Sequence, residues 1–271
     1  MKRFACSVLA LMVCAVPGWG QRRMDDGATP RPRQTGANTA EAAQLQWLMM
    51  GTGRNSIGTN AGVAPGGIVS VDALKVPSAA IKEMQKFFKD FDAGKLDSSV
   101  RHLTKAIEIH PEWAAAHHTL GQTYARMGDY DKAVVEFQKA AELDARPERS
   151  WVGLATVYFL KKSYADGESA ARRALEIDPL NVDARYFLAR NLVGAGKTTD
   201  EAVELLTKSK ERFAVARLLL ANIHLRNGKV SAAVEELRGY VAQPGAEQKA
   251  KVECMVRHLT EPAGTVACPM Q

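Results

Sequence analysis

The chain has 271 residues, of which 46% are hydrophobic, 24% charged and 7% aromatic. These proportions are typical of a folded soluble protein and exclude both an integral membrane protein and a wholly disordered one. The formal charge is +6. Because Lys2 and Arg3 lie in a predicted targeting segment, the mature chain would carry about +4, an excess too small and too dispersed to indicate nucleic-acid binding.

The first twenty residues have the layout of a secretory signal peptide. Lys2 and Arg3 form a positive start, residues 4–16 are an apolar run, and the break that follows is rich in small residues. This pattern predicts a signal peptide over residues 1–20 that is cleaved near Gly20. We therefore expect an exported protein, either periplasmic or secreted.

Two alternatives to a cleaved signal stay open. A retained membrane anchor is disfavoured because the apolar run of residues 4–16 falls short of the ~20 residues that span a bilayer. The other alternative is a lipoprotein anchored through Cys14, since Leu11-Met12-Val13-Cys14 resembles a lipobox. Bulky Val13 stands where that pattern has a small residue.

Export changes how the four cysteines are counted. Cys6 and Cys14 leave with the signal, so the mature chain keeps Cys254 and Cys268. An even pair of cysteines in an oxidising compartment favours a disulfide between them, with two unpaired thiols as the alternative. Such a bridge would fasten the C-terminal end of the chain to the preceding helix.

A polar, glycine-rich segment from residue 21 to residue 78 precedes the repetitive part of the chain. No apolar period in it is long enough to bury a core, so a mostly disordered, flexible arm is expected. Two apolar islands interrupt it, a short helix over residues 41–50 and a strand-like run over 67–71. The arm is either a linker or a segment that binds a partner or this protein's own groove.

The rest of the chain repeats itself. Leu120-Gly121, Leu154-Ala155 and Leu188-Ala189 follow one another at intervals of 34 residues, and Leu220-Ala221 comes 32 residues later. Further positions keep the same register within each unit. They are Tyr124, Tyr158, Leu192 and His224, then Ala133, Gly167, Ala202 and Ala233, and then Phe137, Ala171, Leu206 and Leu237.

This pattern resembles the tetratricopeptide repeat (TPR) family, whose repeats carry Trp-x2-Leu-Gly-x2-Tyr, Ala-x3-Phe and Pro. The resemblance implies an all-α fold, a right-handed superhelical solenoid of antiparallel helix pairs. Apolar stripes at helical spacing, turn glycines such as Gly128, and prolines such as Pro179 favour the same architecture independently. Small residues at Gly121 and its equivalents would let the paired helices approach closely.

The expected domains follow from the period. A degenerate repeat over residues 79–113 has Phe87 where a small residue belongs, as expected of a terminal repeat. Full repeats cover residues 114–147, 148–181, 182–213 and 214–245. Residues 246–271 form a capping helix and tail, with Val252, Met255, Val256 and Leu259 along one apolar stripe of the helix.

No catalytic motif emerges from the sequence. Gly194-Ala195-Gly196-Lys197-Thr198 resembles the end of a phosphate loop, but Asn191 stands where the first glycine is needed and no strand leads in. The six histidines do not form a zinc-binding pattern, and no serine elbow or carboxylate pair stands out. We therefore predict no cofactor, no metal and no enzymatic activity, with an enzyme of unrecognised type as a remote alternative.

What remains is a groove for another protein. The resemblance to TPR proteins implies that the first helix of each repeat lines a concave face where a peptide segment binds, in an extended form that suits arginine-to-carboxylate contacts. The leading hypothesis is a cell-envelope scaffold that assembles or recruits another protein, with no nucleic acid and no membrane span in the mature form. The alternative is a self-assembling or self-inhibited module whose arm occupies the groove. The predicted groove residues are His118, Gln122, Arg126, Thr156, Phe159, Tyr186, Arg190, Asn222 and Arg226.

Overall fold

The computed structural model describes residues 76–243 and 249–261. These residues belong to two units, and the chain passes from one to the other between Phe213 and Ala214. The first unit comprises residues 76–213 and the second comprises residues 214–243 and 249–261. The predicted signal peptide, the arm up to residue 75, Cys14 and Cys268 lie outside the described residues.

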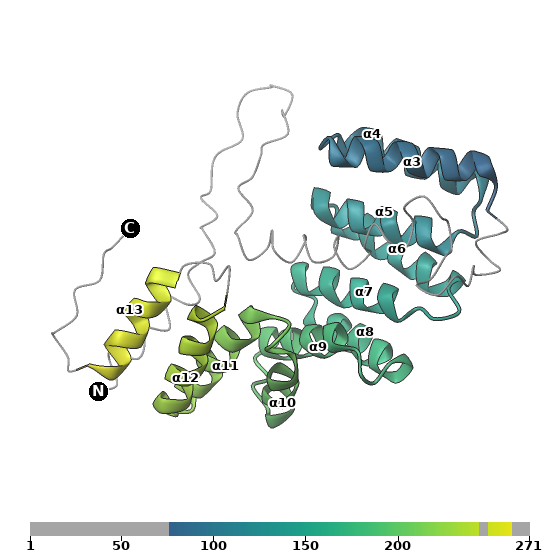
Figure 1. Ribbon diagram of the computed structural model, residues 1–271. Coiled ribbons are helices and arrows are strands. Elements are labelled where there is room, and N and C mark those ends of the chain that lie inside the picture. The colour runs from purple at the N-terminus through teal and green to yellow at the C-terminus, as the bar shows by residue number, and fades with distance from the viewer. Residues whose placement is uncertain (1–75, 244–248, 262–271) are drawn as a thin grey trace, which may run out of the picture. The chain divides into compact units, whose positions relative to one another are not determined.

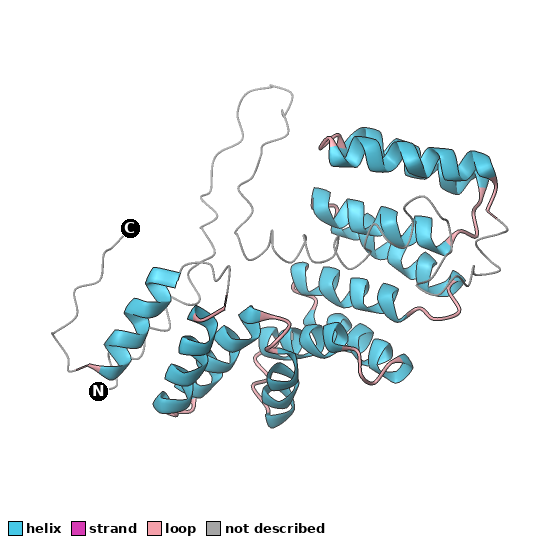
Figure 2. Ribbon diagram, viewed as in Figure 1, coloured by secondary structure: helices cyan, strands magenta, loops and turns pink. Residues whose placement is uncertain are grey.

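The described residues form α-helices and contain no strand (Figure 2). Consecutive helices pack against each other as pairs, α3 with α4, α5 with α6, α7 with α8, α9 with α10 and α11 with α12 (Figure 1). The predicted all-α fold of stacked helix pairs is confirmed. The helices of the first unit are α3 (Ser78–Asp92), α4 (Leu96–Ile109), α5 (Ala114–Met127), α6 (Tyr130–Leu143), α7 (Glu148–Leu160), α8 (Tyr164–Ile177), α9 (Val182–Gly194) and α10 (Asp200–Ser209). Those of the second unit are α11 (Ala214–Arg226), α12 (Val230–Val241) and α13 (Lys249–Thr260).

The turn between the two helices of a pair contains a residue in the left-handed backbone conformation. Gly94, Gly128, Gly196 and Gly228 have φ angles of 73°, 83°, 79° and 72°. Glycine adopts this region without steric cost, which explains why it recurs at the turn. Gly196 is thus a turn residue between α9 and α10, and the likeness to a phosphate loop has a structural explanation. The turn between α7 and α8 uses Lys162 instead, at φ 62°, where an L-residue costs roughly 1–2 kcal/mol.

A single phenylalanine joins three helices in the core of the first unit. The Phe137 side chain of α6 is fully buried. A Cβ atom added to Gly121 of α5 would lie 3.1 Å from its ring, and one added to Gly153 of α7 would lie 2.6 Å away. The small residue expected at Gly121 therefore makes room for this ring, and Gly153 makes room for it on the next repeat.

The first helix pair has a core that departs from the repeat pattern. Phe87, which replaces the usual small residue, is 1% exposed and packs with Met84 and Leu103. Its ring centroid lies 5.0 Å from that of Phe88 and 5.3 Å from that of Phe91. A bulky residue fits here because α3, α4 and α5 enclose it together, with Leu103 of α4 and Leu120 of α5 in the same core cluster.

The second unit ends on the predicted apolar stripe. Val252 and Val256 of α13 are buried against Leu237 and Tyr240 of α12, and Met255 and Leu259 pack beside them at partial burial. The helix begins at Lys249, and the expected start at residue 246 lies outside the described residues.

The structure describes one cysteine of the predicted C-terminal pair. Cys254 of α13 is disulfide-bonded. The partner predicted for it, Cys268, lies outside the described residues. The pairing of Cys254 with Cys268 therefore stays a prediction.

Candidate functional site

The first helices of neighbouring repeats lie next to one another. In the first unit α5 contacts α7, and α7 contacts α9, whereas successive second helices make only marginal contacts. The first helices α5, α7 and α9 therefore share one side of the stack. We call the surface of α5, α7 and α9 on this side the first-helix face.

The predicted groove residues have unequal exposure. Arg126 is exposed, and His118 and Phe159 are partly buried. Gln122, Thr156, Tyr186 and Arg190 are buried, with exposed fractions of 2%, 0%, 3% and 7%. Polar residues at these positions thus lie deeper than the open groove expected from the sequence.

Two predicted groove residues belong to the second unit. Asn222 and Arg226 belong to α11 of the second unit, so they are not placed in one site with those of the first. Thr156 does not offer its hydroxyl to a ligand. The hydroxyl donates a 2.9 Å hydrogen bond to the Val152 carbonyl in the same helix, α7. That bond satisfies its donor, and the side chain is fully buried.

Arg190 is the centre of the site. Its guanidinium carbon lies 4.0 Å from the ring centroid of Phe159 on α7 and 5.5 Å from that of Tyr186 on α9. Its Nη1 atom is buried and has no hydrogen-bond partner. A buried guanidinium nitrogen without a partner is costly, and a carboxylate is its best complement.

Aromatic packing holds the other side of this arginine in place. The Tyr186 ring stacks on Phe213 with centroids 4.0 Å apart and an interplanar angle of 6°. Burial raises the pKa of Tyr186, against the opposing influence of Arg190, so its phenol is neutral at physiological pH. The aromatic rings have few rotatable bonds, so they hold the Arg190 guanidinium in a fixed position.

Two more contacts cross between first helices. The Arg126 guanidinium of α5 lies 4.8 Å from the ring centroid of Phe91 on α3. His118 Nδ1 of α5 lies 3.2 Å from Ser150 Oγ at the start of α7. Sequence reasoning placed Arg126 and His118 on this face but missed Phe91 and Ser150. Both could have been found by pairing positions on neighbouring first helices, about one repeat apart.

His118 is held neutral. Burial, with a smaller contribution from the positive charge of Arg149, lowers the pKa of His118 from 6.5 to about 3. The imidazole also packs edge-on against Phe137, with ring centroids 5.2 Å apart. A proton on this ring would therefore be unfavourable in the folded state.

This arrangement predicts acid sensitivity between pH 6.5 and 5. In that window an unfolded chain binds a proton on His118 and the folded chain does not, so stability should fall as the pH is lowered. Since the side chain is partly exposed, we expect roughly 1 kcal/mol rather than the full value of the shift. Urea unfolding at both pH values measures the loss, and His118→Gln should remove it. An equal loss in that variant would contradict the assignment.

The described residues contain neither a cluster of metal ligands nor a membrane-spanning helix. No three His, Cys, Asp or Glu side chains converge closely enough there to hold a metal ion. None of the helices in residues 76–243 and 249–261 combines the length and the apolar character needed to cross a membrane.

Comparison with known proteins identifies the repeat. Tetratricopeptide repeat family models match residues 114–146 and 186–247. The chain contains tetratricopeptide repeats. The resemblance seen in the sequence is thereby confirmed, and the matched residues include α5 and most of α9 on the first-helix face.

Curated relatives share short stretches with this TPR protein. The chain is 26% identical over 129 residues to "Anaphase-promoting complex subunit 3" of Schizosaccharomyces pombe, a match that covers 45% of this chain and 19% of the relative. It is 27% identical over 105 residues to "Hsp70-Hsp90 organizing protein 2" of Arabidopsis thaliana, covering 39% and 18%. The chain thus spans about a fifth of the length of these relatives.

Known structures share the TPR fold. PilF of Pseudomonas aeruginosa aligns with a TM-score of 0.58 at 18% identity, covering 67% of this chain and 84% of that one. MamA of Desulfovibrio magneticus aligns at 0.55 and 17%, covering 61% and 94%. YrrB, described as a TPR protein with an unusual peptide-binding site, aligns at 0.51 and 20%, covering 64% and 91%. At these identities the likeness concerns the fold alone.

Proposed function

We propose that this TPR protein is an exported, non-catalytic scaffold that holds an acidic segment of a partner protein on its first-helix face. TPR proteins generally mediate protein–protein interaction, and the proposal adds the ligand chemistry and the compartment. The observation that carries it is Arg190, a buried guanidinium that lies on Phe159 and leaves Nη1 without a partner.

The neighbouring side chains suit such a ligand. A carboxylate at Arg190 would form charge-assisted hydrogen bonds in a dry setting, where they are strongest. Arg126 adds an exposed positive charge on the same face, and Phe159 offers an apolar contact for the next side chain. His118 remains neutral beside Ser150 and does not compete for the carboxylate.

The decisive experiment is site-specific photo-crosslinking in the native cell. A photo-reactive amino acid placed at exposed Arg126 should form an adduct with a partner segment that contains Asp or Glu. Because the buried guanidinium supplies the main charge-assisted contact, Arg190→Gln should lower the adduct yield by about tenfold. The control is Arg146→Gln in the loop between α6 and α7, which should leave the yield unchanged.

Two outcomes would overturn the proposal. One is an adduct whose yield does not change in Arg190→Gln while circular dichroism shows native helix content. The other is an adduct with residues 21–75 of the same chain, which would make the site self-occupied. Deletion of these residues would then lower the midpoint of thermal unfolding, whereas a scaffold for a separate partner keeps it.

The export half of the proposal rests on the signal-like layout of residues 1–20. Intact mass spectrometry of the protein recovered from the envelope fraction should give a chain that begins after Gly20. A chain that retains Met1, recovered from the cytosol, would contradict export and leave the binding site untouched.

A further inference from the structure

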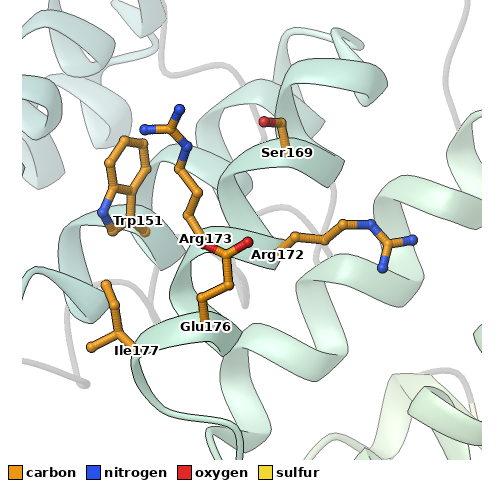
Figure 3. Close-up of a pocket in the computed structure, with 6 residues that line it drawn as sticks. All are labelled: Trp151, Ser169, Arg172, Arg173, Glu176 and Ile177. Atoms are coloured by element: carbon orange, nitrogen blue, oxygen red, sulfur yellow. The ribbon is translucent and has the colours of Figure 1, made fainter.

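A hollow of about 500 Å³ lies beside α7 and α8 in the first unit (Figure 3). Trp151 of α7 forms one wall, and the other lining residues belong to one stripe of α8. No lining residue is among the predicted groove residues. The lining consists of Trp151, Ser169, Arg172, Arg173, Glu176 and Ile177.

The helix pair that carries the hollow departs from three other pairs in one set of positions. In three helix pairs, a residue of the first helix forms a polar pair with the residue 19 positions later in the second helix. In the pair of α7 and α8 these two positions hold Trp151 and Ala170 instead. The three pairs are Glu83 with His102 at 2.7 Å, His117 with Glu136 at 2.7 Å, and Arg217 with Glu236 at 3.1 Å.

This exchange changes the surface in two ways. Ala170 is short and 3% exposed, so Trp151 has no polar partner at the position 19 residues later. Trp151 is only partly buried and presents an apolar wall, which Ile177, at 41% exposed, extends. An apolar wall of this kind within a polar rim is typical of protein interaction sites.

Two neighbouring arginines at the hollow differ in their partners. Arg172 contacts both carboxylate oxygens of Glu201, at 2.8 and 3.0 Å, and also bonds to Glu168 at 3.0 Å. Arg173 lies with its guanidinium carbon 4.8 Å from the Trp151 ring centroid (Figure 3). It forms no ion pair with any Asp or Glu of the described residues. Arg173 is therefore an exposed guanidinium that is positioned by stacking and able to take a carboxylate.

We propose that this hollow is a second protein-binding surface, for a partner segment in which an acidic side chain precedes an apolar one. The carboxylate binds the guanidinium edge of Arg173, and the apolar side chain packs on Trp151 and Ile177. Glu176 also lines the hollow and can accept a backbone N–H of the segment.

The test is a titration followed by NMR at the Trp151 indole. The full chain has four tryptophans, and Trp151→Phe identifies the signal. The probes are acetyl-Gly-Asp-Leu-Gly-amide and its Asn-Leu counterpart. The Asp-Leu peptide should shift the Trp151 signal, and the Asn-Leu peptide should need about tenfold higher concentration for the same shift, as expected from losing one charge-assisted contact.

Matched variants separate this surface from the rest of the molecule. Arg173→Gln should weaken the Asp-Leu peptide by about tenfold, whereas Arg172→Gln, whose guanidinium is already engaged by glutamates, should change it less than about twofold. Arg190→Gln should have no effect, so the proposal stands or falls independently of the first-helix face. No shift at Trp151, equal binding of both peptides, or an unchanged affinity in a folded Arg173→Gln variant would each overturn it.

Discussion

Phe137→Ala should lower the free energy of unfolding by about 3–5 kcal/mol. The ring is fully buried, and it occupies space left by Gly121 on α5 and Gly153 on α7. Since neither glycine has a side chain to refill that space, the cavity would remain open. Urea unfolding followed by circular dichroism measures the loss.

A matched truncation on the same helix provides the control. Val135 of α6 is 61% exposed, so Val135→Ala should change stability by less than about 0.5 kcal/mol. Gly153→Ala tests the same contact from the other side, because its new methyl group would collide with the ring. A loss in the free energy of unfolding of less than about 1 kcal/mol in Phe137→Ala would contradict this role, because truncation of a buried phenylalanine normally costs more.

Gly167→Ala should destabilise the protein by about 1–3 kcal/mol, although alanine is the better helix former. An added Cβ would lie 2.1 Å from the side-chain oxygen of Asn191 on α9. Asn191 is fully buried and cannot turn aside easily, because its amide donates to the carbonyls of Ala155 at 3.1 Å and Phe187 at 2.8 Å. Thermal unfolding of the variant reports the cost.

A double-mutant cycle with Asn191→Ala identifies the cause. The smaller side chain removes the collision, so Gly167→Ala should cost at least ~1 kcal/mol less in that background than in the parent. Simple additivity of the two substitutions would show that the steric account of Gly167 is wrong. The cycle thus tests a contact between neighbouring repeats, not only the helix propensity of one residue.

The period of the sequence predicted the helix pairs because buried positions and turn residues recur with it. Gly128 marks a turn, Leu120 marks a core position, and each needs only local chemistry to be recognised. Lys162 escapes this reasoning. It takes the left-handed turn conformation without being glycine, and only the equivalence of its position to Gly128 suggests the turn.

The candidate site was less predictable, because periodicity assigns a side chain to a face but not to a depth. Arg190 and Phe159 were both placed on the groove, yet nothing local indicated that they stack at 4.0 Å. The hollow at Trp151 lies where a polar pair is replaced by Trp151 and Ala170, and a motif search for functional residues does not detect such a replacement. Such features follow from the separation and tilt of neighbouring helices, which the repeat pattern leaves undetermined.

The side chains offered to a ligand on the first-helix face are also the contacts that connect one repeat to the next. Arg190 bridges α9 to Phe159 of α7, and Arg126 bridges α5 to Phe91 of α3. In the proposed complex, a ligand that draws a guanidinium off its ring would loosen the joint between two repeats. Because such coupling is reciprocal, stretching that joint would strengthen the hold on the ligand, so binding and elastic extension of the first unit would be coupled.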